Sequence, residues 1–235
     1  MTIFSILFFS ALIGGGAVFT MGQIKGNALK LTLAFSGSYL LAISVLHLIP
    51  EIYQSDHNEL VGPFILLGFF LQILLEYFSG GLEHGHAHNH GGANNTLPLA
   101  IIISLCVHAF TEGIPLGPAM ASSESLSFGN PLLLGIAIHK MPVAFVLTSF
   151  LLASCKSRIT AASILLLFAF MAPLGAGVHH IWDGLHDHMH MVLAIVIGIF
   201  LHVSTTILFE SSDNHRFNLY KIIIIIFGAG LAFLN

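Results

Sequence analysis

Two apolar stretches of the sequence carry side chains that could hold a metal ion. The stretch HAFTEG begins at His108 and places Glu112 four residues later, while AIHKMPVAF places His139 beside Lys140. Residues four apart lie one turn apart on the same face of a helix. Imidazole nitrogen and carboxylate oxygen together suit Zn²⁺ and similar transition metals. We therefore predict a metal site formed by His108, Glu112 and His139, with a fourth position open to water or another ligand.

Two simpler interpretations compete with this one. A single buried histidine can be a packing residue, and a His–Glu pair can be a neutral hydrogen-bonded couple. A shared site is favoured because two successive apolar runs carry ionisable groups at similar depth, where each such group costs at least about 2.5–3.5 kcal/mol. Pro115 and Pro142 follow these groups closely. Proline kinks helices, and broken helices recur at transporter binding sites.

The composition indicates an integral membrane protein. Of the 235 residues, 56% are hydrophobic and 8% are charged, against about 25% charged in soluble domains. Long apolar runs in lipid must be helices, because only a helix satisfies its own backbone hydrogen bonds. Eight runs approach the spanning length of about 17–25 residues, at 2–22, 31–50, 61–79, 97–121, 129–153, 160–178, 191–210 and 219–234. The first lacks a basic leader, so we interpret it as a span rather than a cleaved signal peptide.

The basic residues predict the orientation of these eight spans. Six of the seven lie in the loops after spans one, five and seven or at the start of span eight: Lys25, Lys30, Lys156, Arg158, Arg216 and Lys221. The loops after spans two, four and six contain no lysine or arginine. The positive-inside rule then places both termini outside.

Histidines also gather outside the predicted spans. The inner loop 80–96 contains HGHAHNH, which is typical of loose metal binding or of a flexible loop without a role. The outer loop 179–190, HHIWDGLHDHMH, could concentrate cations or be merely solvated. His47 and Glu51, at the outer end of span two, could form an access site or simply lie at the interface. His202 and Glu210, in span seven, could line an exit path or cap a helix end.

Taken together, these motifs resemble the ZIP (Zrt/Irt-like) divalent-metal transporters over nearly the whole chain. HAFTEG is similar to the family signature H-[NSA]-x-x-[DE]-G, and the other similar stretches are HLIPE in span two, PLGAG in span six and GIFLHVSTTILFE in span seven. HKMPVAF, in span five, is similar to the branch of the family with HKxPxAF at that point.

The resemblance implies a single membrane domain over residues 1–235, with eight helices arranged as three, two and three. It implies an inverted pseudo-repeat, a homodimer and alternating access in which spans four and five carry the ion. Many members build a two-metal centre, but this sequence has Ala109 and Val143 at two positions that contribute to it, and Lys140 where several relatives have an acidic ligand. We therefore expect one metal site, with the ammonium of Lys140 standing in for a second cation.

The sequence thus predicts a zinc-preferring transporter that moves metal into the cytoplasm and is not an enzyme. Zn²⁺ is expected as transported substrate, with Fe²⁺, Mn²⁺ or Cd²⁺ as alternatives, and no prosthetic group or nucleic acid is expected. We expect the plasma (inner) membrane, with an organelle membrane as the alternative. Two other functions remain open: an intramembrane metal-dependent hydrolase, against which the absence of an HExxH motif counts, and a metal sensor without transport.

Overall fold

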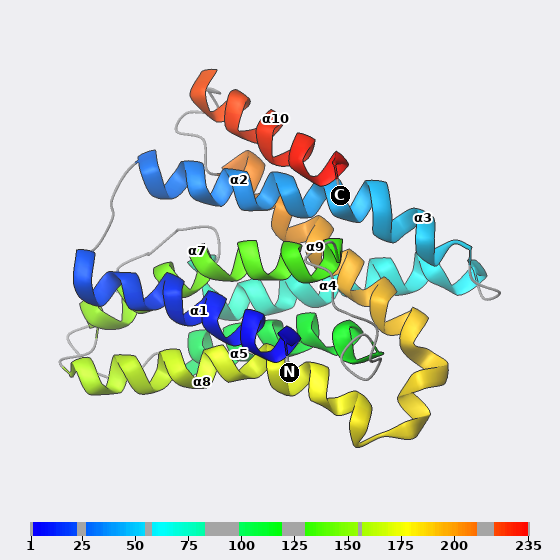
Figure 1. The fold of residues 1–235 in the computed structure, drawn as a ribbon, viewed down its shortest axis with the longest axis horizontal. Coiled ribbons are helices and arrows are strands. Elements are labelled where there is room, and N and C mark those ends of the chain that lie inside the picture. Colours follow the sequence, from blue (N-terminus) through cyan, green and yellow to red (C-terminus); the bar gives the residue numbers. More distant parts are fainter. Residues whose placement is uncertain are drawn as a thin grey trace.

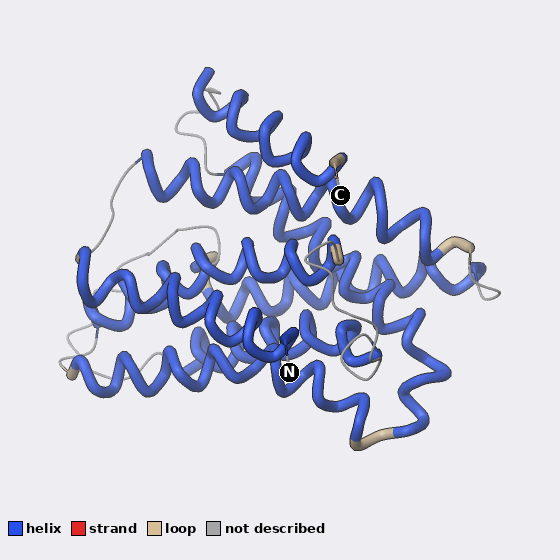
Figure 2. Tube along the Cα trace, viewed as in Figure 1, coloured by secondary structure: helices blue, strands red, loops and turns tan. Residues whose placement is uncertain are grey.

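The computed structural model describes residues 2–22, 27–54, 58–82, 99–118, 130–154, 157–210 and 219–234. Within these ranges the chain forms helices joined by short turns, with no strand (Figure 2). The prediction of an all-α protein is confirmed for this part of the chain. Most of the histidine-rich segment 80–96 lies outside the described residues.

Within the described ranges, eight main helices follow one another (Figure 1): α1 (Thr2–Met21), α2 (Asn27–Ile43), α4 (Asn58–Ser79), α5 (Leu99–Gly113), α7 (Pro131–Ser154), α8 (Arg158–Gly177), α9 (Met189–Glu210) and α10 (Leu219–Phe233). Shorter elements extend them: the π-helical turn η1 (Ser44–Leu48) and α3 (Ile49–Ile52) after α2, and the 3₁₀ turns η3 (Ile114–Leu116), η4 (Val178–His180) and η5 (Asp183–His188).

Seven helical segments of the described chain are long and apolar enough to cross a membrane. The eighth helix, α10, is apolar but has 15 residues, which is short of the usual span of about 20. Each of the eight predicted apolar runs therefore forms a helix. The boundaries differ most at the fourth run, predicted over 97–121, where α5 gives way to a 3₁₀ turn after Gly113.

The helices pack as two groups of four. In one group α1 packs on α7 and α8, α7 packs on α8, and α8 packs on α5; in the other α2 packs on α9 and α10, and α9 packs on α4. The two groups meet where α2 packs on α7 and where α4 packs on α5 (Figure 1). A site carried by α5 and α7 therefore lies close to the seam between the groups.

Glycines bring pairs of helices into backbone contact. A Cβ atom on Gly113 of α5 would collide with the carbonyl group of Ala172 in α8, and one on Gly175 would collide with the carbonyl oxygen of Phe110. Helices α4 and α9 approach in the same way at Gly68. In lipid there is little hydrophobic force between helices, so small residues that permit close packing hold them together. These contacts fix α5 firmly against α8.

The prolines near the predicted site affect the two helices differently. α7 runs unbroken through Pro142, although proline cannot donate the backbone hydrogen bond at that position. The neighbouring helices α1, α2 and α8 pack along α7 and hold it in place. In α5 the α-helix ends at Gly113 and tightens into η3, which contains Pro115. A change of helix type thus occurs one residue after Glu112 but not beside His139.

Three described basic residues lie near the starts of three helices: Lys30 in α2, Arg158 in α8 and Lys221 in α10. The starts of these three helices gather at the left end of the bundle in Figure 1. The basic ends therefore share one face of the molecule. Lys25, Lys156 and Arg216 are outside the described residues.

Candidate metal centre

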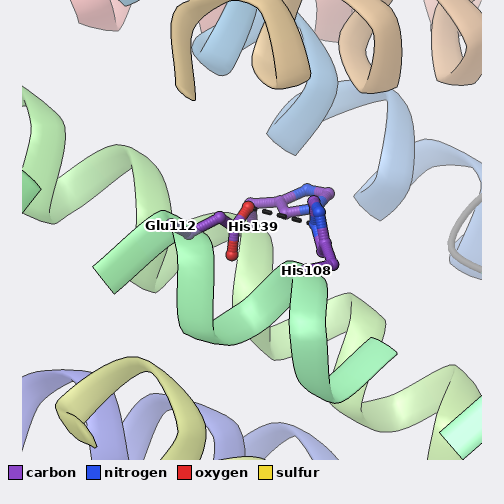
Figure 3. A group of neighbouring side chains, drawn as sticks. All are labelled: His108, Glu112 and His139. Carbon is purple, nitrogen blue, oxygen red and sulfur yellow. Dashed lines mark ion pairs between the residues drawn. The ribbon is translucent and has the colours of Figure 1, made fainter. Parts of the chain in front are cut away.

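His108, Glu112 and His139 converge on one point between α5 and α7 (Figure 3). His108 and Glu112 project from successive turns of α5, and Nε2 of His108 lies 3.1 Å from Oε1 of Glu112. The ring of His139 stands nearly perpendicular to that of His108, with 6.2 Å between the ring centroids. All three side chains are at most 2% exposed. We refer to these three residues as the His–Glu cluster.

The His–Glu cluster fits a tetrahedral metal ion. One ligand atom from each residue lies within 4.8 Å of the others, and this is the one such group of histidine, cysteine or acidic residues within the described ranges. Bonds of about 2.0–2.2 Å at tetrahedral angles place two zinc ligands about 3.3 Å apart. The 3.1 Å between His108 and Glu112 already matches this spacing. The two ligand atoms that lie farthest apart must approach by about 1.5 Å for all three residues to bind one ion.

A fourth polar side chain, Lys140, is buried beside Glu112. Its Nζ lies 3.7 Å from Oε2 of Glu112 and 5.1 Å from the centroid of the Phe168 ring in α8. Lys140 is 1% exposed, so bulk solvent does not reach its ammonium group. With neutral histidines, the charges of Glu112 and Lys140 cancel. A divalent cation arriving at the His–Glu cluster would therefore meet one carboxylate that already has a positive partner.

Apolar side chains close the polar group off on both sides along the helices. On α7, Ile136 belongs to one buried apolar cluster and Val143 to another, with His139 and Lys140 between them. On α5 the same division separates Leu116 from Leu105, with His108 and Glu112 between them. The His–Glu cluster thus lies in a polar layer between two apolar layers.

Two polar residues of α4 contact buried histidines, and none of the sequence motifs identified them. Nδ1–H of His108 donates a hydrogen bond of 3.0 Å to the amide oxygen of Gln72. One turn further along α4, Oε2 of Glu76 lies 3.4 Å from Nδ1 of His202 in α9. Gln72 and Glu76 are spaced i, i+4 in the apolar stretch LQILLEYF, which is the same signal that identified His108 and Glu112.

A separate cavity of about 540 Å³ opens near the other end of α5. His47 and Glu51 of the second span line it, together with Pro115 and Leu116 of η3. Nε2 of His47 lies 2.9 Å from the carbonyl oxygen of Ala232 in α10. The cavity comes within one helical turn of Glu112 along the sequence. The structure therefore does not bring His47 and Glu51 into the His–Glu cluster but places them on a neighbouring cavity.

Comparison with known proteins identifies similar sequences. A family model described as "ZIP Zinc transporter" matches residues 81–235, about two thirds of the chain. Zinc transporter ZIP9-B of Xenopus laevis is 30% identical over 125 residues, which cover 52% of this chain and 41% of that protein. Zinc transporter ZIP9 of Micropogonias undulatus is 28% identical over the same length, covering 40% of that protein. The chain thus spans less than half the length of these two relatives. Zinc transporter ZIP1 of Danio rerio is 23% identical in an alignment that covers 66% of this chain and 65% of that protein.

Proposed function

The chain belongs to the ZIP zinc transporter family, and from that premise we propose that it carries Zn²⁺ across a membrane, bound in transit by His108, Glu112 and His139. The observation that supports this proposal most directly is the convergence of the three side chains within 4.8 Å in the buried middle of a multi-pass bundle. Ionisable groups at such a depth are costly and usually mark a substrate pathway.

The donor atoms favour particular ions. Two imidazoles and one carboxylate suit Zn²⁺, with Fe²⁺, Mn²⁺ and Cd²⁺ as further substrates. Ca²⁺ and Mg²⁺ prefer six or more oxygen ligands, or an octahedral shell that retains water. One carboxylate and one amide oxygen cannot supply such a shell, so these ions are poor substrates.

The apolar layers on both sides of the His–Glu cluster favour a carrier cycle over an open pore. An unshielded ion in an apolar medium costs tens of kcal/mol, so a dication cannot cross either layer while it is closed. The ion enters when one layer opens, binds, and leaves when the other opens. The seam between the two helix groups, at the α2–α7 and α4–α5 contacts, is where such movement changes access to the cluster. The cavity beside His47 and Glu51 is the proposed approach on the outer side.

The remaining features of the proposal follow from charge and from family resemblance. The common face of Lys30, Arg158 and Lys221 faces the cytoplasm, as the positive-inside rule requires, so both termini lie outside. The family resemblance adds that metal moves into the cytoplasm. Residues 1–235 form one domain with an inverted pseudo-repeat, and the chain works as a homodimer in the plasma (inner) membrane. The loops 80–96 and 179–190 hold ions on the inner and outer sides respectively.

The rival functions have less support. A hydrolase needs a general base beside the metal, but the one carboxylate of the His–Glu cluster is itself a ligand and is paired with Lys140. The family model and the relatives described above are named as zinc transporters. A sensor would bind zinc without moving it, and flux measurements separate these possibilities.

The test is zinc uptake into proteoliposomes that contain the purified chain. Wild-type protein is expected to show saturable uptake, and His108→Ala and Glu112→Ala are expected to abolish it. Glu59→Ala, which removes an exposed glutamate near the start of α4, is the matched control and should transport normally. Folded protein that binds zinc at the cluster but shows no flux would exclude transport and favour the sensor, while metal-dependent turnover of a lipid or peptide would favour the hydrolase.

A further inference from the structure

Gln72 of α4 makes a contact with the His–Glu cluster that none of the motifs accounts for. Its side chain is 0% exposed although it lies in an apolar helix. Its amide oxygen accepts the Nδ1–H of His108 at 3.0 Å. A buried amide in a membrane helix is unfavourable unless its hydrogen bonds are satisfied. The position therefore has a polar role rather than a packing role.

We propose that Gln72 is a positioning residue that fixes His108 in the form that binds metal, an inference that rests on the proposed transport function. A neutral imidazole carries one proton, and the hydrogen bond made by one ring nitrogen determines which nitrogen is left as a lone-pair donor. With the proton held on Nδ1 by Gln72, the lone pair lies on Nε2. That nitrogen is the one 3.1 Å from Oε1 of Glu112, and the two atoms are spaced to share one ion.

The same hydrogen bond fixes the direction of the ring. Metal-binding histidines commonly donate their other N–H to an oxygen acceptor, which orients the ring and makes the ligand nitrogen more basic. His108 has to meet both Glu112, on its own helix, and His139, on α7. A ring free to rotate about χ2 would lose the alignment with Glu112. Gln72 prevents this from outside the cluster.

The location of Gln72 gives the contact a second consequence. Gln72 belongs to the group of α2, α4, α9 and α10, whereas the His–Glu cluster belongs to the group of α1, α5, α7 and α8. Ser104 makes a neighbouring link across the same seam, with its hydroxyl donating to the carbonyl oxygen of Leu75. A displacement of α5 along α4 would break the Gln72 contact and leave His108 less well aligned. Metal affinity is therefore tied to the arrangement of the two groups seen here.

The experiment measures zinc dissociation constants of the full chain purified in detergent, by competition with a chromophoric chelator. Gln72→Met keeps the length of the side chain but removes the acceptor, and it should weaken binding by about 10- to 100-fold. Gln72→Glu keeps an acceptor oxygen and should bind at least as tightly as wild type. Ser104→Ala removes the neighbouring hydrogen bond across the seam without touching the cluster and should bind like wild type. The KM for uptake should follow the dissociation constants.

The possible results separate this inference from the proposed function. If Gln72→Met binds zinc within about threefold of wild type, or if Gln72→Glu is as weak as Gln72→Met, the positioning role is wrong. If Gln72→Met does not fold, Gln72→Asn takes its place, since it remains polar but is one methylene too short to reach Nδ1. If wild type binds no more zinc than His108→Ala, the metal site itself fails, and the inference fails with it. Weak zinc binding by Gln72→Met, together with wild-type zinc binding by Ser104→Ala, supports both the metal site and the positioning role of Gln72.

Discussion

Lys140 and Glu112 should stabilise the fold only as a pair, and a double-mutant cycle tests this. Nζ of Lys140 lies 3.7 Å from Oε2 of Glu112. At an effective dielectric constant of about 20, two opposite unit charges at this distance attract with about 4.5 kcal/mol. Removing one partner of a buried pair typically costs about 3–5 kcal/mol, because the other charge is left uncompensated. The attraction of about 4.5 kcal/mol therefore lies within the range of about 3–5 kcal/mol that removing one partner costs.

The expected cycle has a distinctive pattern. Lys140→Met and Glu112→Gln should each lower the unfolding temperature of the metal-free protein in detergent by roughly 6–20 °C, the shift that 3–5 kcal/mol gives in a chain of this size. The double variant, Glu112→Gln with Lys140→Met, should recover most of the loss, because replacing a buried ion pair by uncharged groups is often neutral. In that variant the amide that replaces the Glu112 carboxylate can donate to Nε2 of His108 in place of a charge interaction.

Adding zinc to the same proteins gives a second measurement, the gain in unfolding stability on binding. Zinc at 100 times its dissociation constant stabilises a folded protein that binds it by about 2.7 kcal/mol. At one fixed zinc concentration, Lys140→Met should gain more stability than wild type, because Glu112 then has no positive partner except the ion. The double variant should gain none. The reasoning is refuted if Lys140→Met unfolds at the wild-type temperature, or if the double variant is as unstable as the sum of the two single variants.

Three further predictions concern packing, a buried cation and ion preference. Gly113→Ala should lower the unfolding temperature by the equivalent of about 1–3 kcal/mol, because the new Cβ meets the backbone of Ala172, whereas Gly16→Ala in α1 has open space and should not lower it. Lys221→Met removes a 2.8 Å hydrogen bond to the carbonyl oxygen of Leu208 and should cost about 1.5–3 kcal/mol of stability with an unchanged dissociation constant for zinc. Excess Cd²⁺ should compete with zinc uptake in proteoliposomes, while the same excess of Ca²⁺ or Mg²⁺ should not; equal inhibition by Ca²⁺ would contradict the assigned ligands.

The sequence predicted the helices well because lipid leaves the backbone few alternatives. An apolar run of spanning length must satisfy its own hydrogen bonds, so each predicted run forms a helix. The local deviations were less predictable. Pro142 lies inside a continuous α7, and Ser44–Leu48 forms a π-helical turn. In both places, contacts with neighbouring helices determine which backbone conformation the helix adopts. Those contacts cannot be seen in one stretch of sequence.

The approach of His108 and Glu112 was predictable for a similar reason, whereas the arrival of His139 from α7 and the surrounding contacts depend on packing. His108 and Glu112 share a helix face at spacing i, i+4, so their approach needed no tertiary information. The contact of Gln72 with His108 depends on α4 packing against α5, a relation between segments 36 residues apart. Glu76 and His202 are farther apart in the chain still. Spacing within a helix therefore predicts which side chains approach each other on that helix, whereas contacts between helices depend on packing.

On the proposed transport function, Lys140 is best understood through the need to release the ion. Structural zinc sites bind with apparent free energies of about 10–16 kcal/mol, and conduction requires binding weak enough for the ion to leave. The His–Glu cluster offers three ligands rather than four, and its one carboxylate already has the ammonium of Lys140 as a partner. The lysine thus reduces what the carboxylate can offer the dication. If this is its role, Lys140→Met should lower both the KM and the maximal rate of zinc uptake, since tighter binding slows release. A lower KM with an undiminished maximal rate would show that release from this site does not limit transport.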